Sequence, residues 1–432
     1  MAREVRHEGS PGPLRRAAAC AVLALGCAHT PLEPARSILD ASSFVAPRPF
    51  RATLVRDAGG RAVTLPPTRF ARSAVESFRV PEDHPLYQYL GNRSFVYDDA
   101  LALIAALALG HFSDARALGE TLQALISPRG EIGFSVQLGE EPFYDREYVR
   151  AGVMAWAGYA LARFDLETGE HRFREAAGRI ADTLLASRLH IAGDPRSGLI
   201  LAGRGRWTDH FRTFDTAFTA DYCVAEHQFD TYFLLRTLAR VEPENRRWAD
   251  EAHALAVRID GSLWLPEGRF ATAVTERGPV GSPALDAAGA WGALYLVETG
   301  DFVRAHAAMR YVRERFPVHV EGLDGFAPFH GGSPDHPGVD FSNMLSAEGT
   351  AGVALALLRL GERGAAQRLA TSLAALQGMS PSGVLYAYPG DEEFPELPSV
   401  ASTAWLLFLQ LELAGRPATV FAPPPARAVA TP

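Results

Sequence analysis

The sequence predicts an all-α fold, an (α/α)6 toroid of six helical hairpins with a disordered N-terminal tether. From about residue 97 onward, helices rich in Ala, Gly and aromatic residues alternate with helices that carry one charged face. Helices of the first kind begin near residues 98, 148, 224, 285, 346 and 400. A helical hairpin repeated about every 50 to 75 residues indicates a repeat architecture, in which the uncharged helices are buried inside and the charged ones face solvent.

The predicted hairpins consist of five inner–outer pairs and one closing helix. The pairs are 97–110 with 113–127, 148–169 with 171–188, 224–241 with 245–264, 285–300 with 301–316, and 346–361 with 362–377, and 399–415 is the last inner helix. Gly110 and Gly169 stand where inner helices should end, as is typical of left-handed C-caps. The sixth outer helix is expected within residues 70–90. An open α-solenoid is the alternative, although the terminal repeats lack the polar capping faces that it needs.

The composition is that of a globular protein with one large domain. The chain has 432 residues, of which 47% are hydrophobic and 21% charged. Its net charge of −8 argues against nucleic acid as a partner. We expect a linker with a possible small β-hairpin at 28–69, the toroid domain at 70–417 and a disordered tail at 418–432.

Residues 1–27 resemble a bacterial lipoprotein signal peptide. Arg15 and Arg16 precede a short apolar run that ends at Cys27 and is too short to span a bilayer. Cys27 is the expected lipidation site, which predicts a membrane partner through an N-terminal lipid anchor. The location is then the bacterial cell envelope, on the outer membrane because Ala28 is not aspartate. Ordinary secretion after cleavage nearby is the alternative.

Long loops precede the inner helices, and polar residues gather where each loop meets its helix. In a closed ring these junctions converge on one mouth of the central cavity. Glu226 and Asp230 are four residues apart on one helix face, so their mutual repulsion should leave one of them protonated near neutral pH. A protonated acid facing an ionised base is what glycosidic cleavage requires. For Asp98, Asp286 and Ser399 the alternative is a role as helix caps.

Aromatic residues in or beside the same loops suit a carbohydrate substrate, because flat rings stack on the apolar faces of sugars. Trp207 and Tyr388 lie in polar loops and are the best candidates. Trp156 and Trp291 lie deep in inner helices and are expected in the core. The sequence holds no phosphate loop, dinucleotide fingerprint or zinc motif, so we expect neither a cofactor nor a metal.

Several segments resemble the six-hairpin glycosidase superfamily, namely FVYDDALALIAALALG, YVRAGVMAWAGYALARFDLETGE, EHQFD, AEGTAGVALALLRLG and STAWLLFLQLE, over about residues 95–415. The resemblance implies the (α/α)6 fold and a carboxylate pair across the cavity mouth. It favours a glycoside hydrolase of an oligo- or polysaccharide, with Glu226 as proton donor, Asp340 or Asp99 as base, and Glu348 as a second candidate donor. The residues expected to bind the substrate are Asp98, Tyr148, Arg150, Trp207, His210, His227, Asp230, His330 and Tyr388.

Two other functions stay open. A sugar epimerase or isomerase, which has a related toroid, would move protons with histidines such as His210, His227 and His330. A non-catalytic glycan-binding scaffold of the envelope would use the acidic residues only to hold the ring together.

Overall fold

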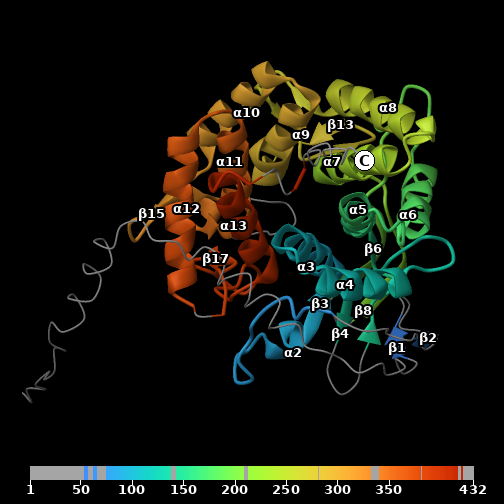
Figure 1. Cartoon of the computed structure of the whole chain (residues 1–432), viewed down its shortest axis with the longest axis horizontal. Coiled ribbons are helices and arrows are strands. Elements are labelled where there is room, and N and C mark those ends of the chain that lie inside the picture. Colours follow the sequence, from blue (N-terminus) through green and yellow to red (C-terminus); the bar gives the residue numbers. More distant parts are fainter. Residues whose placement is uncertain are drawn as a thin grey trace, which may run out of the picture.

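The computed structural model describes residues 53–56, 62–65, 74–137, 143–208, 213–280, 282–331, 340–380, 382–416 and 420–421. Their helices form two concentric rings (Figure 1). The inner helices are α3 (Val96–Leu109), α5 (Ala151–Thr168), α7 (Ala225–Val241), the π-helix η1 (Asp286–Ala290) continued by α9 (Trp291–Thr299), α11 (Ala347–Arg359) and α13 (Val400–Leu413). The outer helices are α4 (Phe112–Leu125), α6 (Arg174–Ala186), α8 (Arg246–Leu263), α10 (Phe302–Arg315) and α12 (Arg363–Gly378).

The inner ring closes on itself, because α13 packs against both α11 and α3. The first inner helix is therefore a neighbour of the last (Figure 1). This closure confirms the (α/α)6 toroid and excludes an open solenoid. Gly110 and Gly169 end α3 and α5 in the left-handed conformation, with φ angles of 79° and 73°, as expected.

The part of segment 70–90 that the structure describes, residues 74–90, does not form the sixth outer helix that we expected there. Residues 74–90 hold one short helix, α2 (Tyr87–Leu90). The chain before α2 runs beside the start of α13, where the N–H of Val400 donates to the carbonyl of Ser77 over 2.9 Å. Pro81 is part of the reason, because proline removes a helical hydrogen bond and restricts the preceding residue.

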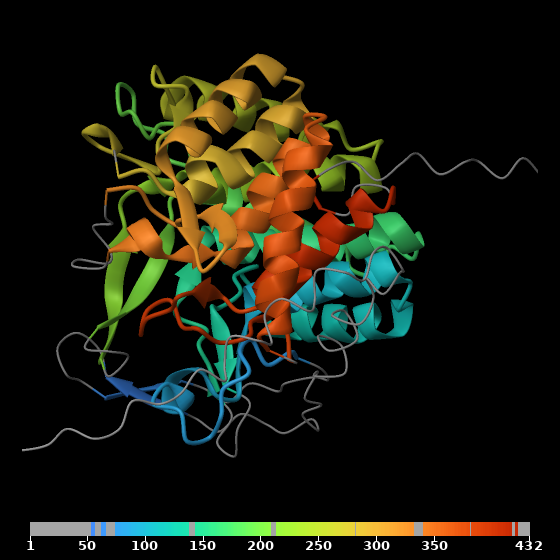
Figure 2. The ribbon, with the colours of Figure 1, turned by 90° about the vertical axis from the view of Figure 1, so that its left-hand side faces the viewer.

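Short antiparallel strands gather at the end of the ring where the inner helices begin. β3, β6, β9 and β16 each end directly before an inner helix, so that their ladders fix the first turns of α3, α5, α7 and α11. The ladders are β3 (Arg93–Phe95) with β4 (Ser135–Gln137) and β5 (Phe143–Tyr144), β6 (Val149–Arg150) with β7 (Gly203–Thr208) and β8 (Thr213–Ala220), β9 (Cys223–Val224) with β12 (Ala273–Thr275) and β13 (Gly278–Val280), and β16 (Leu345–Ser346) with β17 (Ala387–Tyr388). In the side view the long β7–β8 hairpin (yellow-green) stands to one side of the helices (Figure 2).

The remaining elements are smaller. Two hairpins, β10 (Trp264–Leu265) with β11 (Arg269–Phe270) and β14 (Pro317–Val320) with β15 (Leu323–Phe326), and a 3-10 turn η2 (Phe341–Asn343) lie in the loops. β1 (Thr53–Arg56) pairs with β2 (Ala62–Leu65), which confirms the hairpin predicted within residues 28–69. Residues 1–27, with Cys27, lie outside the described residues. Among the helices that are described, none has the length and apolar character needed to cross a membrane.

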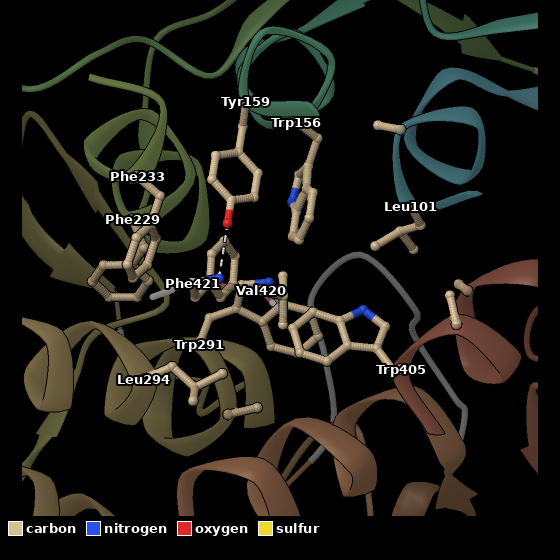
Figure 3. Packing of buried hydrophobic residues seen from close by; sticks show 14 of the residues in the cluster. Leu101, Trp156, Tyr159, Phe229, Phe233, Trp291, Leu294, Trp405, Val420 and Phe421 are labelled. Carbon is tan, nitrogen blue, oxygen red and sulfur yellow. Dashed lines mark hydrogen bonds between the residues drawn. The ribbon is translucent and has the colours of Figure 1, made fainter. Parts of the chain in front are cut away.

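The centre of the ring is filled by two residues that follow α13. Val420 and Phe421 are 0% and 1% exposed. Phe421 lies among aromatic side chains of the inner helices, stacked on Phe233 with 4.2 Å between ring centroids (Figure 3). Its backbone N–H donates to the Tyr159 hydroxyl over 2.9 Å. The prediction of a disordered tail from residue 418 is therefore wrong for these two residues, because an isolated apolar pair gives no periodic signal.

Candidate active site

A cavity of about 1140 Å³ opens at the end of the ring where the inner helices begin. Each of the six inner helices contributes at least one lining residue from its first two turns, and α2, strands β3, β6 and β7 and the loops supply the others. The ladders before the inner helices therefore position the cavity wall. A cavity of this size suits a ligand larger than a single sugar ring.

Five of the carboxylates that line the cavity belong to inner helices, namely Asp98 on α3, Glu226 and Asp230 on α7, Asp286 on η1, and Glu348 on α11. Burial raises the pKa of Asp98 and of Glu226 to about 7 and that of Glu348 to about 8. Burial and then the neighbouring carboxylates raise the pKa values of Asp230 and Asp286 well above the ordinary value. Several of these groups therefore hold protons near neutral pH. In the described part of the chain, no three His, Cys, Asp or Glu side chains are arranged to hold a metal ion.

Glu348 is held by two aromatic side chains from neighbouring helices. The hydroxyl of Tyr97 on α3 donates a hydrogen bond to Glu348 Oε1. Trp405 on α13 donates through Nε1 to the Tyr97 oxygen over 2.9 Å. The hydrogen bond from Tyr97 stabilises the ionised form and opposes the effect of burial on the Glu348 pKa. The carboxyl group is thus oriented by a chain of contacts that joins three inner helices.

Glu226 reaches further into the cavity, and 41% of its side chain remains open to solvent there. The surrounding walls nevertheless displace enough water to raise its pKa to about 7. His227 Nε2 lies 3.9 Å from Glu226 Oε1. Burial, followed by the charge of Arg150, lowers the pKa of His227 to about 3, so the imidazole is neutral and does not neutralise the carboxylates.

Helices α5 and α7 approach closely at Gly152. A Cβ atom at this position would lie 2.4 Å from His227 Cδ2 and 3.3 Å from Asp230 Oδ2. Glycine therefore allows both side chains to lie against the backbone of α5. One turn further along α5, the indole of Trp156 donates a hydrogen bond to the Asp230 carboxylate.

Seven of the predicted site residues line the cavity. They are Asp98, Arg150, Trp207, Glu226, His227, Asp230 and Glu348. Trp207 Nε1 donates to Asp145 Oδ2 over 2.9 Å. Arg150 Nη1 donates to three backbone carbonyls of β6 and β7 at 2.8 to 3.0 Å, and its guanidinium carbon lies 4.3 Å from the centre of the Tyr148 ring. Tyr148 therefore supports Arg150 from behind the cavity wall.

The two acids expected as catalytic bases lie elsewhere, so their predicted placement at the cavity is wrong. Asp99 is fully buried and accepts hydrogen bonds from Val75 N at 2.8 Å and Ser94 Oγ at 2.9 Å, which tie the segment before α2 to α3. Successive helical residues point about 100° apart, so the second of two adjacent acids leaves the cavity. Asp340 is exposed and accepts a hydrogen bond from Ser342 N at 3.0 Å.

Three other predicted binding residues also fall outside the cavity wall or the described chain. Tyr388 donates to Glu321 Oε2 over 2.6 Å and does not line the cavity. His330 packs against Phe316, with 5.9 Å between ring centroids, and does not line it either. The expected position of these two residues at the cavity wall is therefore not what the structure shows. His210 lies outside the described residues.

The sequence interpretation missed one carboxylate and part of the aromatic wall. Asp286, for which a helix cap was the alternative and which was left out of the expected site residues, lines the cavity. The same explanation is confirmed for Ser399, whose side chain accepts from Ser402 N over 3.1 Å. Trp156 and Trp291 are 3% and 5% exposed, as expected of core residues, and yet their remaining surface lines the cavity. The signal for Asp286 was its place at the start of an inner helix.

Solved structures of similar shape are found among carbohydrate enzymes. A D-mannose isomerase is 12% identical, with a TM-score of 0.56 and coverage of 79% of this chain and 92% of its own. The unsaturated glucuronyl hydrolase of Bacillus sp. GL1, responsible for the degradation of glycosaminoglycan, is 13% identical, with a TM-score of 0.52 and coverage of 89% and 94%. An α-amylase from Clostridium perfringens is 11% identical, with a TM-score of 0.51 and coverage of 74% and 87%.

No protein-family model and no curated protein sequence matches the chain. The likeness to the solved structures, at 11–13% identity, concerns the fold. At that level it confirms the resemblance seen in the sequence, because the chain has the six-hairpin (α/α)6 fold of these enzymes.

Proposed function

We propose that the protein is a carbohydrate-active enzyme, and specifically a glycoside hydrolase of an oligo- or polysaccharide. The observation that supports this proposal is the set of carboxylates with raised pKa values in one cavity that also has aromatic walls. Glycosidic cleavage needs a carboxylic acid that still holds its proton near neutral pH and a second carboxylate that is ionised. Two enzymes of the same fold, the glucuronyl hydrolase and the α-amylase, are hydrolases of carbohydrate.

We assign the proton donor to Glu348 and the base to Glu226. Glu348, with a pKa of about 8, keeps its proton at pH 7 and is oriented by Tyr97. Glu226, with a pKa of about 7, is half ionised at that pH, and 41% of its side chain is open to solvent. In the proposed reaction Glu348 transfers its proton to the glycosidic oxygen as the bond to the anomeric carbon breaks. Glu226 removes a proton from the water whose oxygen bonds to that carbon.

This assignment differs from the expectation from sequence, in which Glu226 was the donor. The change follows from the surroundings of the two carboxyl groups. Glu348 is enclosed by aromatic side chains and by the charges of Asp98 and Glu226, which favour its neutral form. Glu226 keeps 41% of its side chain open to cavity water, where an attacking water molecule would bind.

The test is a screen of the purified protein against bacterial and plant oligosaccharides, with the appearance of reducing ends as the readout. We expect Glu348→Gln and Glu226→Gln each to lower the rate on any accepted substrate by about 10²- to 10⁴-fold. The matched control is Asp340→Asn, which also removes one carboxylate charge but at an exposed position outside the cavity. Full activity in either cavity variant would contradict the proposed roles.

A sugar isomerase or epimerase is the second candidate, and His227 is the observation that favours it. This neutral imidazole lines the cavity, and its Nδ1 has no hydrogen-bond partner among the described residues. The D-mannose isomerase shares the fold. Conversion of a sugar without a change of mass, abolished in His227→Gln and not in Glu348→Gln, would favour this function. Glycan binding without any turnover would favour the scaffold.

We also propose that Cys27 carries a lipid that anchors the protein in the bacterial cell envelope. The proposal rests on the apolar run before Cys27 and the two arginines ahead of it. Metabolic labelling with a radioactive fatty acid tests it in the native cell. Labelled wild-type protein and unlabelled Cys27→Ser protein are expected, whereas equal labelling or none would contradict the proposal.

A further inference from the structure

We propose that the cavity binds a saccharide that carries a free, positively charged amino group, and that it excludes sugar acids. This inference rests on the proposed function insofar as the ligand is a carbohydrate. It names the class of sugar that the cavity accepts.

The first observation is the excess of acidic over basic side chains among the described residues that line the cavity. Five carboxylates lie in the wall and Glu392 and Glu393 lie at the rim. The one lining arginine, Arg150, directs Nη1 to backbone carbonyls and lies over the Tyr148 ring. His227 is neutral, as its lowered pKa shows. The wall therefore holds many acids and very little opposing charge.

The second observation is independent of the number of acids. Asp98 and Asp230 line the cavity and are each 4% exposed, and the Oδ1 atom of each has no hydrogen-bond partner among the described residues. The other contacts of these carboxylates are made, since Asp98 accepts from Ser77 and the Ala401 N–H, and Asp230 accepts from Trp156. A buried oxygen without a partner is costly, so the two open oxygens point to a ligand that donates hydrogen bonds.

An ammonium group fits these requirements better than a hydroxyl group. It brings three N–H donors and one positive charge, so it can donate to an open carboxylate oxygen and offset part of the surrounding negative charge. Without such a ligand, burial in the cavity wall and then the neighbouring carboxylates keep protons on these groups, so their pKa values are raised. A bound ammonium group would replace those protons. The nearby indoles of Trp156 and Trp291 add aromatic surface, which attracts cations and also stacks on sugar rings.

A uronate would meet the opposite situation. Its carboxylate would lie among like charges, and the arginine of the wall already directs part of its donors to the backbone. The arrangement therefore selects against anionic sugars as well as for cationic ones.

The experiment is isothermal titration of the purified full-length protein with four methyl glycosides of one stereochemical series, those of glucosamine, glucose, N-acetylglucosamine and glucuronic acid. We expect the glucosamine derivative to bind about tenfold or more tighter than the glucose derivative, because a charged hydrogen bond replaces a neutral one. The glucuronate should bind weakest. Titration in two buffers of different ionisation enthalpy should show that the amine releases protons and that the glucose derivative does not.

Substitutions test which carboxylate is responsible for the preference for the amino sugar. Asp230→Asn should remove most of the preference for the amine, whereas Asp340→Asn, the same substitution at an exposed position outside the cavity, should retain it. Ethylammonium chloride at equal ionic strength controls for attraction of any cation. Equal affinity for the amine and the hydroxyl sugar, tighter binding of the uronate, or no binding of the amine would each overturn the inference.

The outcomes for this inference and for the hydrolase proposal are distinguishable. Hydrolysis of a neutral glycan without any preference for the amine would support the hydrolase proposal and contradict the inference that the ligand is an amino sugar. Preferential binding of the amine without hydrolysis of amino-sugar oligomers would support the ligand class and reject the hydrolase.

Discussion

Replacement of Phe421 by alanine should destabilise the protein strongly, although the residue belongs to no helix or strand. Its ring is 1% exposed, with centroids 4.2 Å from Phe233, 4.9 Å from Trp156 and 5.9 Å from Trp405. Loss of a buried phenylalanine ring costs about 3–5 kcal/mol of unfolding free energy. The cost falls at the low end only where neighbours can move into the space that the ring leaves.

Here the neighbours are held in place, so we expect about 4–5 kcal/mol. The rings around Phe421 belong to different inner helices of a closed ring, and a shift of one helix would disturb its neighbours on both sides. The backbone at this point is also fixed. Arg359 donates to the carbonyls of Val420 at 2.6 Å and Phe421 at 3.0 Å, and its guanidinium pairs with Glu412 at 2.6 Å.

Urea unfolding followed by tryptophan fluorescence measures the effect. The matched control is Phe302→Ala, which removes the same ring from a residue that is 51% exposed on α10. We expect the control to lose less than about 1 kcal/mol. A loss below about 1 kcal/mol for Phe421→Ala, or losses that are equal in the two variants, would refute the argument that this residue fills the centre of the ring.

Three further predictions concern the cavity. Burial, then the charges of Glu226 and Asp286, raise the pKa of Asp230, so the folded state holds a proton that the unfolded state releases above about pH 4, and stability falls as the pH rises toward 8. Asp230→Asn should therefore raise Tm by a few degrees at pH 8 and leave it unchanged at pH 4. The same change in Tm at both pH values would contradict this prediction. Tyr97→Phe removes a hydrogen bond that lowers the Glu348 pKa, so the basic limb of the pH–activity profile should move to higher pH, while an unmoved limb would show that Tyr97 only packs. Gly152→Ala should lower the free energy of unfolding in urea by about 1–3 kcal/mol, because it forces a Cβ atom against His227. The control Gly261→Ala, in open space on α8, should leave this free energy unchanged or raise it by up to about 1 kcal/mol. Equal effects of the two substitutions would contradict the close approach of α5 and α7 at Gly152.

The sequence was sufficient for the repeated part of the fold, because helical periodicity and glycine ends are local signals. Six inner helices begin within a few residues of their predicted starts, and the loops before them do form the cavity mouth. The segment before α2 was not predictable in this way. Its contacts with the start of α13 join residues about 320 positions apart, a long-range pairing that leaves no local pattern.

The sequence predicted the type of site, a group of carboxylates at the cavity mouth, but only some of the residues that form it. The i,i+4 spacing placed Glu226 and Asp230 on one face correctly, because helix geometry alone decides it. The choice between neighbouring acids such as Asp98 and Asp99 depends on how far each helix is rotated in the ring, which is a tertiary property. The same holds for Asp340, which is exposed and does not line the cavity.

The two ends of each inner helix have different roles. The first two turns supply the cavity wall, and the turns beyond them pack into the shared core. The ladders of β3, β6, β9 and β16 hold the starting points of four of these helices independently of what their first turns carry. Residues such as Glu226 and Asp286 can therefore change without repacking the interior. Because of this separation, substrate range can change by evolution or by engineering. At least one position at the start of each inner helix can be substituted while the packed core of the toroid stays intact.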